Sequence, residues 1–128
     1  WLLRFIRHYR REGKIHIDFA CDGFLGNYEG EVRDQIFQCS AGISTASILA
    51  DGSISGCPNT QAKFRQGNIY KDNFMDVWNN GFKEYRNREW ARKGACSDCD
   101  MFRYCEGNGM HLHGDDGKLP ACHYKRIQ

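Results

Sequence analysis

The residues best suited to chemistry in this chain are its seven cysteines. Three lie within ten residues, from Cys96 through Cys99 to Cys105, and Cys122 follows after a loop rich in glycine and histidine. A C-x2-C pair at a turn can place both sulfurs on one metal ion or cluster, and two further thiolates then complete four-fold ligation. The spacing predicts a metal or iron–sulfur site, with disulfides or buried free thiols as the alternative. It does not separate iron from zinc, because four thiolates suit both.

A second pair of thiols, Cys39 and Cys57, flanks an expected β-hairpin. Asp51-Gly52 suits a type I′ turn, in which both central residues take positive φ, so strands are expected at 43–50 and 53–57. Such a hairpin would bring Cys57 back alongside the chain that follows Cys39. Two thiols that are distant in sequence could then meet.

The N-terminal segment reads as a helix followed by a strand. Residues 1–11 have helical apolar spacing, and Gly13 is a good helix terminator. Residues 14–19 alternate apolar and polar side chains, which is the period of a strand. His16 and Asp18 would share its polar face, which we interpret as exposed rather than catalytic. A short helix is expected at 31–37.

A central helical segment is expected after residue 72, with Asp72 or Asn73 as its N-cap. Its apolar side chains recur at helical spacing and are interpreted as core rather than as a platform for stacking bases: Phe74, Val77, Trp78, Phe82, Tyr85 and Trp90. Residues 94–128 show little periodicity, so a bound metal would supply much of their folding free energy.

Composition narrows the class of protein. The 128 residues suffice for one domain, and 41% hydrophobic with 13% aromatic residues favours a folded chain. A net charge of +2 requires no nucleic-acid partner, and no apolar run approaches the roughly 18 residues of a membrane span. An odd number of cysteines prevents complete internal disulfide pairing and favours a reducing, cytoplasmic setting. Because the chain starts at Trp1 inside an expected helix, we expect a C-terminal fragment of a larger enzyme.

The cysteine pattern resembles the signature of the SPASM domain, the C-terminal extension of many radical S-adenosylmethionine enzymes. Twelve residues separate Cys39 from Gly52, and four residues separate Gly52 from Cys57. The family's C-x2-C-x5-C-x3-C run and final cysteine are matched by Cys96, Cys99, Cys105 and Cys122. Gly67-Asn68-Ile69 and Trp78 also resemble the family's connecting segment.

The resemblance implies a fold and a division of the chain. It spans roughly residues 37–124 and implies a small α+β domain at 31–128, built of a β-hairpin, a central helical segment and metal-organised loops. Residues 1–30 would then be the last helix and strand of a catalytic (β/α) barrel.

The resemblance also implies ligands for two auxiliary [4Fe–4S] clusters. Cys96, Cys99, Cys105 and Cys122 would hold one cluster, whereas Cys39 and Cys57 would share the other with an upstream cysteine and with the last residue of C-x3-C. Here the upstream candidate is Cys21, and the last position is Gly109.

Three interpretations of this second site are open. It could hold a cluster with an open iron, recruit His111 or His113, whose imidazole can ligate iron, or hold no cluster.

No residue pattern in the chain indicates catalysis by these residues alone. The C-x3-C-x2-C motif of the radical-generating cluster is absent, and the Gly23–Gly30 run lacks the Lys-Ser/Thr of a P-loop. The resemblance implies an auxiliary-cluster domain that passes electrons or binds a peptide or protein substrate, with S-adenosylmethionine bound only by the parent enzyme. The alternative is a structural zinc module for protein binding, and zinc could also replace a cluster in an aerobic preparation. A secreted disulfide protein is disfavoured.

Overall fold

The computed structural model describes residues 1–127 and has the expected α+β composition. One helix, α1 (Leu2–Glu12), and a short α2 (Glu29–Val32) precede a three-stranded sheet. The strands are β1 (Ser47–Ile48), β2 (Ser53–Ser55) and β3 (Gly67–Asn68), and the helices that follow are α3 (Phe74–Asn80), α4 (Lys83–Arg86), α5 (Phe102–Cys105) and α6 (His123–Ile127). Short 3₁₀ helices lie at Gly26–Tyr28, Ala62–Phe64, Glu89–Ala91, Gly94–Cys96 and Met110–Leu112.

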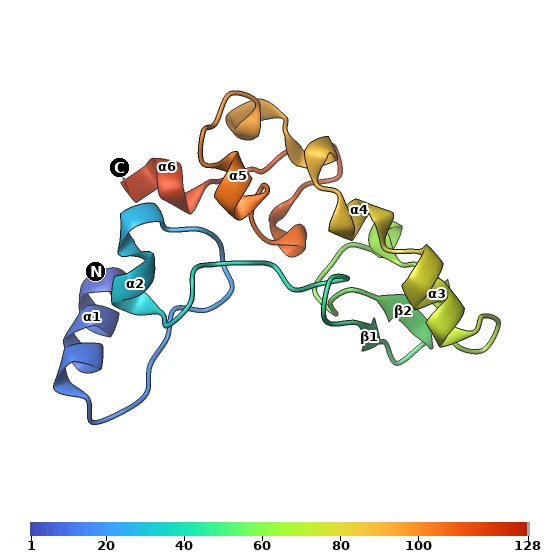
Figure 1. Ribbon diagram of the computed structural model, residues 1–128, viewed down its shortest axis with the longest axis horizontal. Helices are drawn as coiled ribbons and strands as arrows, with labels where there is room; N and C mark the ends of the chain where they lie inside the picture. Colours follow the sequence, from blue (N-terminus) through green and yellow to red (C-terminus); the bar gives the residue numbers. More distant parts are fainter. Residues whose placement is uncertain (128) are drawn as a thin grey trace.

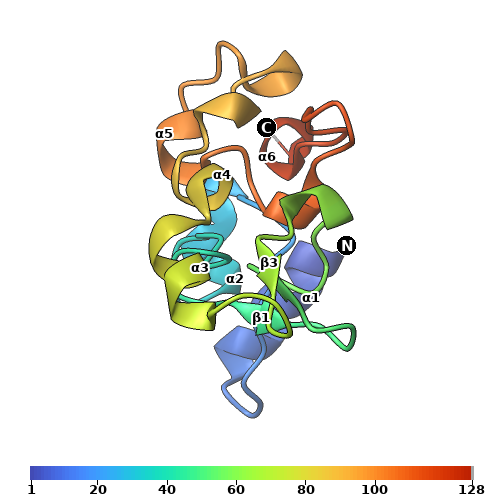
Figure 2. The ribbon, with the colours of Figure 1, turned by 90° about the vertical axis from the view of Figure 1, so that its right-hand side faces the viewer.

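The molecule is elongated (Figure 1). Helices α1 and α2 lie at one end and the sheet with α3 at the other, and an extended segment after α2 joins the two ends. Helix α6 returns to the N-terminal end, where Ile127 packs against the cluster of Ile6, Leu25 and Val32. In Figure 2 the molecule is turned so that the end with the sheet and α3 faces the viewer.

The hairpin forms, but with shorter strands and a different turn than expected. Strands β1 and β2 are antiparallel, with Ile48 opposite Ile54, and β3 adds to the other edge of β2. Leu49 N donates to Ser53 O at 2.8 Å, which leaves three loop residues. Among them only Gly52 has a positive φ, of 79°, so the type I′ prediction is wrong. A three-residue loop needs just one left-handed position, and a Cβ there would lie 2.6 Å from Tyr70 Cε2.

Of the three elements predicted in residues 1–37, one forms as expected and two differ. Helix α1 is confirmed and ends at Gly13 with φ 65°. The predicted strand at 14–19 does not form within residues 1–127, because the segment has no partner strand and pairs only through Phe19 N, which donates to Val32 O at 2.8 Å. The helix predicted at 31–37 is instead α2, which ends at Val32.

The central segment is confirmed as a helix and as core. The Asn73 side chain accepts hydrogen bonds from Met75 N and Asp76 N, as an N-cap should. Phe82 and Tyr85 are fully buried in the largest core cluster, and the other predicted aromatic residues pack against it. The Tyr85 hydroxyl donates to Phe64 O at 3.0 Å and accepts from Gly56 N at 3.2 Å. This core therefore holds the backbone next to Cys57.

No helix within residues 1–127 has the length and apolar character needed to cross a membrane.

Candidate metal centres

Residues 94–127, called the C-terminal lobe below, contain four thiols: Cys96, Cys99, Cys105 and Cys122. Cys96 ends a 3₁₀ helix, Cys105 ends α5 and Cys122 precedes α6, so short elements fix their positions. Burial, and then the neighbouring thiols of Cys105, Cys122 and Cys99, raise the pKa of Cys96 to about 11. The four side chains are thus close enough to influence one another electrostatically. At neutral pH the Cys96 thiol is protonated, so metal or cluster binding must release its proton.

The loop after α5 folds back on Cys105, where Asn108 N donates to Cys105 O at 2.7 Å. Glu106, Gly107 and Asn108 have positive φ values of 46°, 80° and 69°, a run that turns the chain sharply. Burial raises the pKa of Cys105, whereas the backbone N–H groups of Gly107 and Asn108 lower it. Donors of this kind stabilise a thiolate and tune the potential of iron–sulfur clusters. The donor set therefore fits a cluster.

Asn108 connects this lobe to the N-terminal segment. Its side-chain oxygen accepts from Phe24 N at 2.7 Å, and its amide nitrogen lies 3.9 Å from the Cys122 sulfur. Asn108 is buried and adopts a left-handed φ that asparagine tolerates better than most residues. In the sequence only the Gly107-Asn108-Gly109 run points to Asn108, since such runs mark tight turns.

A second site forms where the hairpin meets the loop around residue 110. A cavity of about 170 Å³ is lined by Cys21, Cys39, Cys57 and His111, with Met110 among its other walls. The predicted approach of Cys57 to the chain after Cys39 is therefore present in the structure. Cys21, eighteen residues before Cys39, lies at the same cavity.

Arg88 interacts with one thiol of each group. Arg88 is 6% exposed, and one of its guanidinium nitrogens donates to Asn108 O at 2.7 Å. Burial lowers the pKa of Arg88, and the electrostatic influence of Cys39, Glu106, Tyr85 and Cys105 opposes that shift. Its Nε has no hydrogen-bond partner within residues 1–127. A buried cation close to both groups suits two anionic clusters, and no sequence signal pointed to it.

His113 does not share the cavity of His111. It is 2% exposed, with Nε2 2.7 Å from Gly107 O and Nδ1 3.1 Å from Gly117 O. Burial lowers its pKa, and its ring lies edge-on to Trp90 at 5.0 Å. Because both ring nitrogens face backbone carbonyls, we interpret His113 as a residue that fixes the loop.

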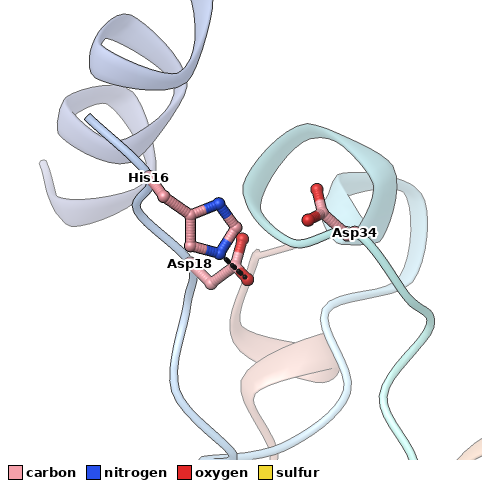
Figure 3. Close-up of side chains that lie close together, drawn as sticks. All are labelled: His16, Asp18 and Asp34. Atoms are coloured by element: carbon pink, nitrogen blue, oxygen red, sulfur yellow. Dashed lines mark ion pairs between the residues drawn. The ribbon is translucent and has the colours of Figure 1, made fainter. Parts of the chain in front are cut away.

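A third cluster lies near the N-terminal helix, where His16, Asp18 and Asp34 bring their ligand atoms within 4.8 Å of one another (Figure 3). All three are exposed, and His16 Nε2 lies 3.2 Å from Asp18 Oδ2. Arg10 forms ion pairs with both aspartates and lowers the pKa of Asp34. This guanidinium already neutralises the carboxylates, so the arrangement is that of a surface ion-pair network.

All seven cysteines are free thiols. Any three of their sulfurs include at least one pair more than 4.8 Å apart. Four thiolates on one zinc ion, each at about 2.3 Å, would be separated by only about 3.8 Å. In a cubane cluster each thiolate binds a different iron, which permits a wider spacing. Among residues 1–127, no three sulfurs lie as close together as one zinc ion would require.

These features define a small α+β domain with two thiol-lined sites. Residues 39–100 match the family model of the SPASM iron–sulfur cluster-binding domain. This part of the chain is therefore a SPASM domain, a domain that binds iron–sulfur clusters. The match includes Cys39, Cys57, Cys96 and Cys99 and ends before Cys105 and Cys122. No curated protein and no solved structure matched the chain.

Proposed function

We propose that this chain is the auxiliary-cluster domain of a radical S-adenosylmethionine enzyme that modifies a peptide or protein. The observation that carries the proposal is the C-terminal lobe, in which Cys96, Cys99, Cys105 and Cys122 interact and backbone donors face the Cys105 sulfur. These four residues would hold one [4Fe–4S] cluster. A bound cluster supplies reversible one-electron transfer.

The protein's own residues would control the surroundings of that cluster. The 3₁₀ helix at Gly94–Cys96 and the turn after Cys105 orient two thiolates, and Asn108 holds the loop against the N-terminal segment through Phe24 N. Phe102 and Leu119 bury Cys96 and exclude water from it. Exclusion of water strengthens every electrostatic interaction in the site.

A role in substrate binding is supported by an open groove of about 390 Å³ beside the second site. Its walls include Asp18, Asp34 and Phe37, and Cys21 lines both the groove and the thiol cavity. A groove with charged and aromatic walls suits a peptide better than a small apolar ligand. A peptide lying there would be close to the second site.

Residues 1–30 are proposed to belong to the end of the catalytic barrel. The support is the surface of α1, where Trp1, Leu2 and Phe5 are exposed apolar side chains. An apolar helix face of this kind is typical of a surface that packs against further protein. The S-adenosylmethionine site and the radical chemistry would then belong to the barrel.

The test is the content of iron, acid-labile sulfide and zinc per chain after anaerobic purification and reconstitution. About four irons and four sulfides would support one cluster in the C-terminal lobe, and about eight of each would support two. Stoichiometric zinc without sulfide would overturn the proposal and leave a structural zinc module.

A further inference from the structure

The glycine at position 109 is not required by the backbone. Gly109 has φ −64° and ψ 141°, which any residue adopts. A Cβ at this position would lie 2.8 Å from His111 Cε1 and 3.0 Å from His111 Nδ1. The same Cβ would be 3.6 Å from Cys21 O. The missing side chain therefore makes room for the His111 ring, next to the segment that carries Cys21.

The cavity at this point has a complete set of four soft or borderline donors. The thiols of Cys21, Cys39 and Cys57 and the imidazole of His111 all line it. They come from four separate segments, so only the folded chain brings them together. The hydroxyls of Thr45 and Thr60, which also line the cavity, donate to backbone carbonyls at 3.2 Å and 2.8 Å. Gln38, Ser40 and Ser47 also line the cavity, but the thiols and the imidazole are the softer donors and the better iron ligands.

The orientation of His111 suits a metal ligand. Its side chain is 20% exposed, and within residues 1–127 its one ion-pair contact joins Nε2 to Asp22 Oδ1 at 3.9 Å. Metal-ligating histidines typically have their second ring nitrogen near a carboxylate, as Nε2 is near Asp22, although 3.9 Å is longer than a hydrogen bond. Nδ1, beside Gly109, is the nitrogen left to bind. His113, two residues later, has neither nitrogen free.

We propose that His111 ligates an iron–sulfur cluster through Nδ1, together with the thiolates of Cys21, Cys39 and Cys57. This inference rests on the proposed function, because it assumes that the domain holds clusters at both sites. On binding, the three thiols release three protons, and the imidazole binds neutral with its proton kept at Nε2 facing Asp22.

A neutral ligand in place of a thiolate leaves the cluster one unit less negative than one with four cysteines. The lower negative charge makes its reduction potential more positive, as histidine ligation does in other iron–sulfur centres. Electrons would therefore pass from the Cys96, Cys99, Cys105 and Cys122 cluster toward the cluster of His111.

The experiment is pulsed electron paramagnetic resonance on the reduced, anaerobically reconstituted chain of 128 residues. The wild-type chain should show the strong nitrogen hyperfine coupling of a bound imidazole, and incorporation of ¹⁵N-histidine should convert it to the ¹⁵N pattern. His111→Ala should abolish the coupling. His16→Ala, which removes an exposed histidine of the Arg10 network, is the matched control and should keep it.

A second variant keeps the test independent of any folding defect in His111→Ala. His111→Cys should retain about eight irons per chain, lose the nitrogen coupling and shift one reduction potential to a more negative value. Three results would overturn the His111 assignment and leave the proposed function standing. They are eight irons without nitrogen coupling in the wild-type chain, four irons per chain, and a coupling that survives in His111→Ala. Zinc without sulfide would overturn both.

Discussion

At the scale of single residues, buried polar side chains beside the thiols determine the electrostatic surroundings of both sites. Asn108 approaches Cys122 with its side chain, and its carbonyl accepts a hydrogen bond from Arg88. Arg88 in turn interacts with Cys39 and Cys105, one thiol of each group. Because a buried charge is only weakly screened by water, this one guanidinium can influence the electron affinity of both sites.

We expect Arg88→Met to lower the reduction potentials of the two proposed clusters. Loss of a buried positive charge destabilises the reduced, more negative state, by on the order of tens of millivolts at an effective dielectric of about 20. Methionine keeps the apolar contact with Trp90, over whose ring the Arg88 guanidinium carbon lies at 6.0 Å. The measurement is a redox titration followed by electron paramagnetic resonance.

The control for Arg88 is Arg92→Met. Arg92 lies over the Phe102 ring at 4.3 Å and lines a surface groove with Cys99, but its side chain is 42% exposed. Water and salt screen its charge, so the potentials should change by much less. Equal shifts in the two variants would contradict a special role for the buried cation.

At the scale of elements, the hairpin and α4 act as a unit through Tyr85. Its hydroxyl accepts from the N–H of Gly56, which precedes Cys57, and donates to Phe64 O. Its ring packs against Phe64 and Phe82 at centroid distances of 6.0 Å and 5.4 Å. Helix α4 therefore determines where one thiol of the second site lies.

Tyr85→Phe should reduce the free energy of unfolding by about 1–3 kcal/mol, because it leaves the buried N–H of Gly56 without its partner, whereas Phe64 O keeps the bond from Gln66 Nε2. Thermal unfolding of the reconstituted chain measures the effect. Tyr70→Phe, at a tyrosine that is 78% exposed, should leave the unfolding temperature nearly unchanged. A similar loss in both variants would indicate that burial of the Tyr85 hydroxyl is not the cause.

The sequence predicted the elements that depend on local spacing. Helix α1, its Gly13 terminus, the Asn73 cap and the aromatic core around Tyr85 all follow from periodicity and capping, which act within a few residues. The strand at 14–19 failed for the opposite reason, since alternation indicates a possible strand but a strand also needs a partner, and none is present among residues 1–127.

The same distinction between local spacing and long-range contacts applies to the two thiol sites. Close spacing in the sequence predicts the Cys96–Cys122 group, whose role as ligands stays a prediction, and the hairpin predicted that Cys57 would return toward Cys39, with which it shares a cavity. The sequence could not separate His111 from His113, because the difference lies in long-range contacts to Asp22, Gly107 and Gly117. Arg88 and Asn108 were missed because only tertiary packing places them beside the thiols.

At the scale of the whole molecule, the interior formed by residues 1–127 is divided into three small cores. One lies around the hairpin and α4, one joins α1 to α6, and the third supports the C-terminal thiols. The third contains only four buried residues, Ala91, Cys96, Phe102 and Leu119. Cores of this size contribute little stability alone, so ligand bonds that cross between segments are expected to supply much of it.

Removal of the clusters should therefore loosen the molecule unevenly. After anaerobic oxidation and chelation of iron, hydrogen–deuterium exchange should rise first in residues 94–125, because their four-residue core includes Cys96, a proposed ligand. It should rise least in the unit of β1, β2, β3 and α4, where Ile54, Phe82 and Tyr85 are fully buried. Cys122→Ser, which removes one ligand without a chelator, should reproduce the change in residues 94–125 while leaving the hairpin protected. A uniform rise over residues 1–127 would mean that the cores unfold as one cooperative unit, and the clusters would then contribute to global stability rather than to the order of one lobe.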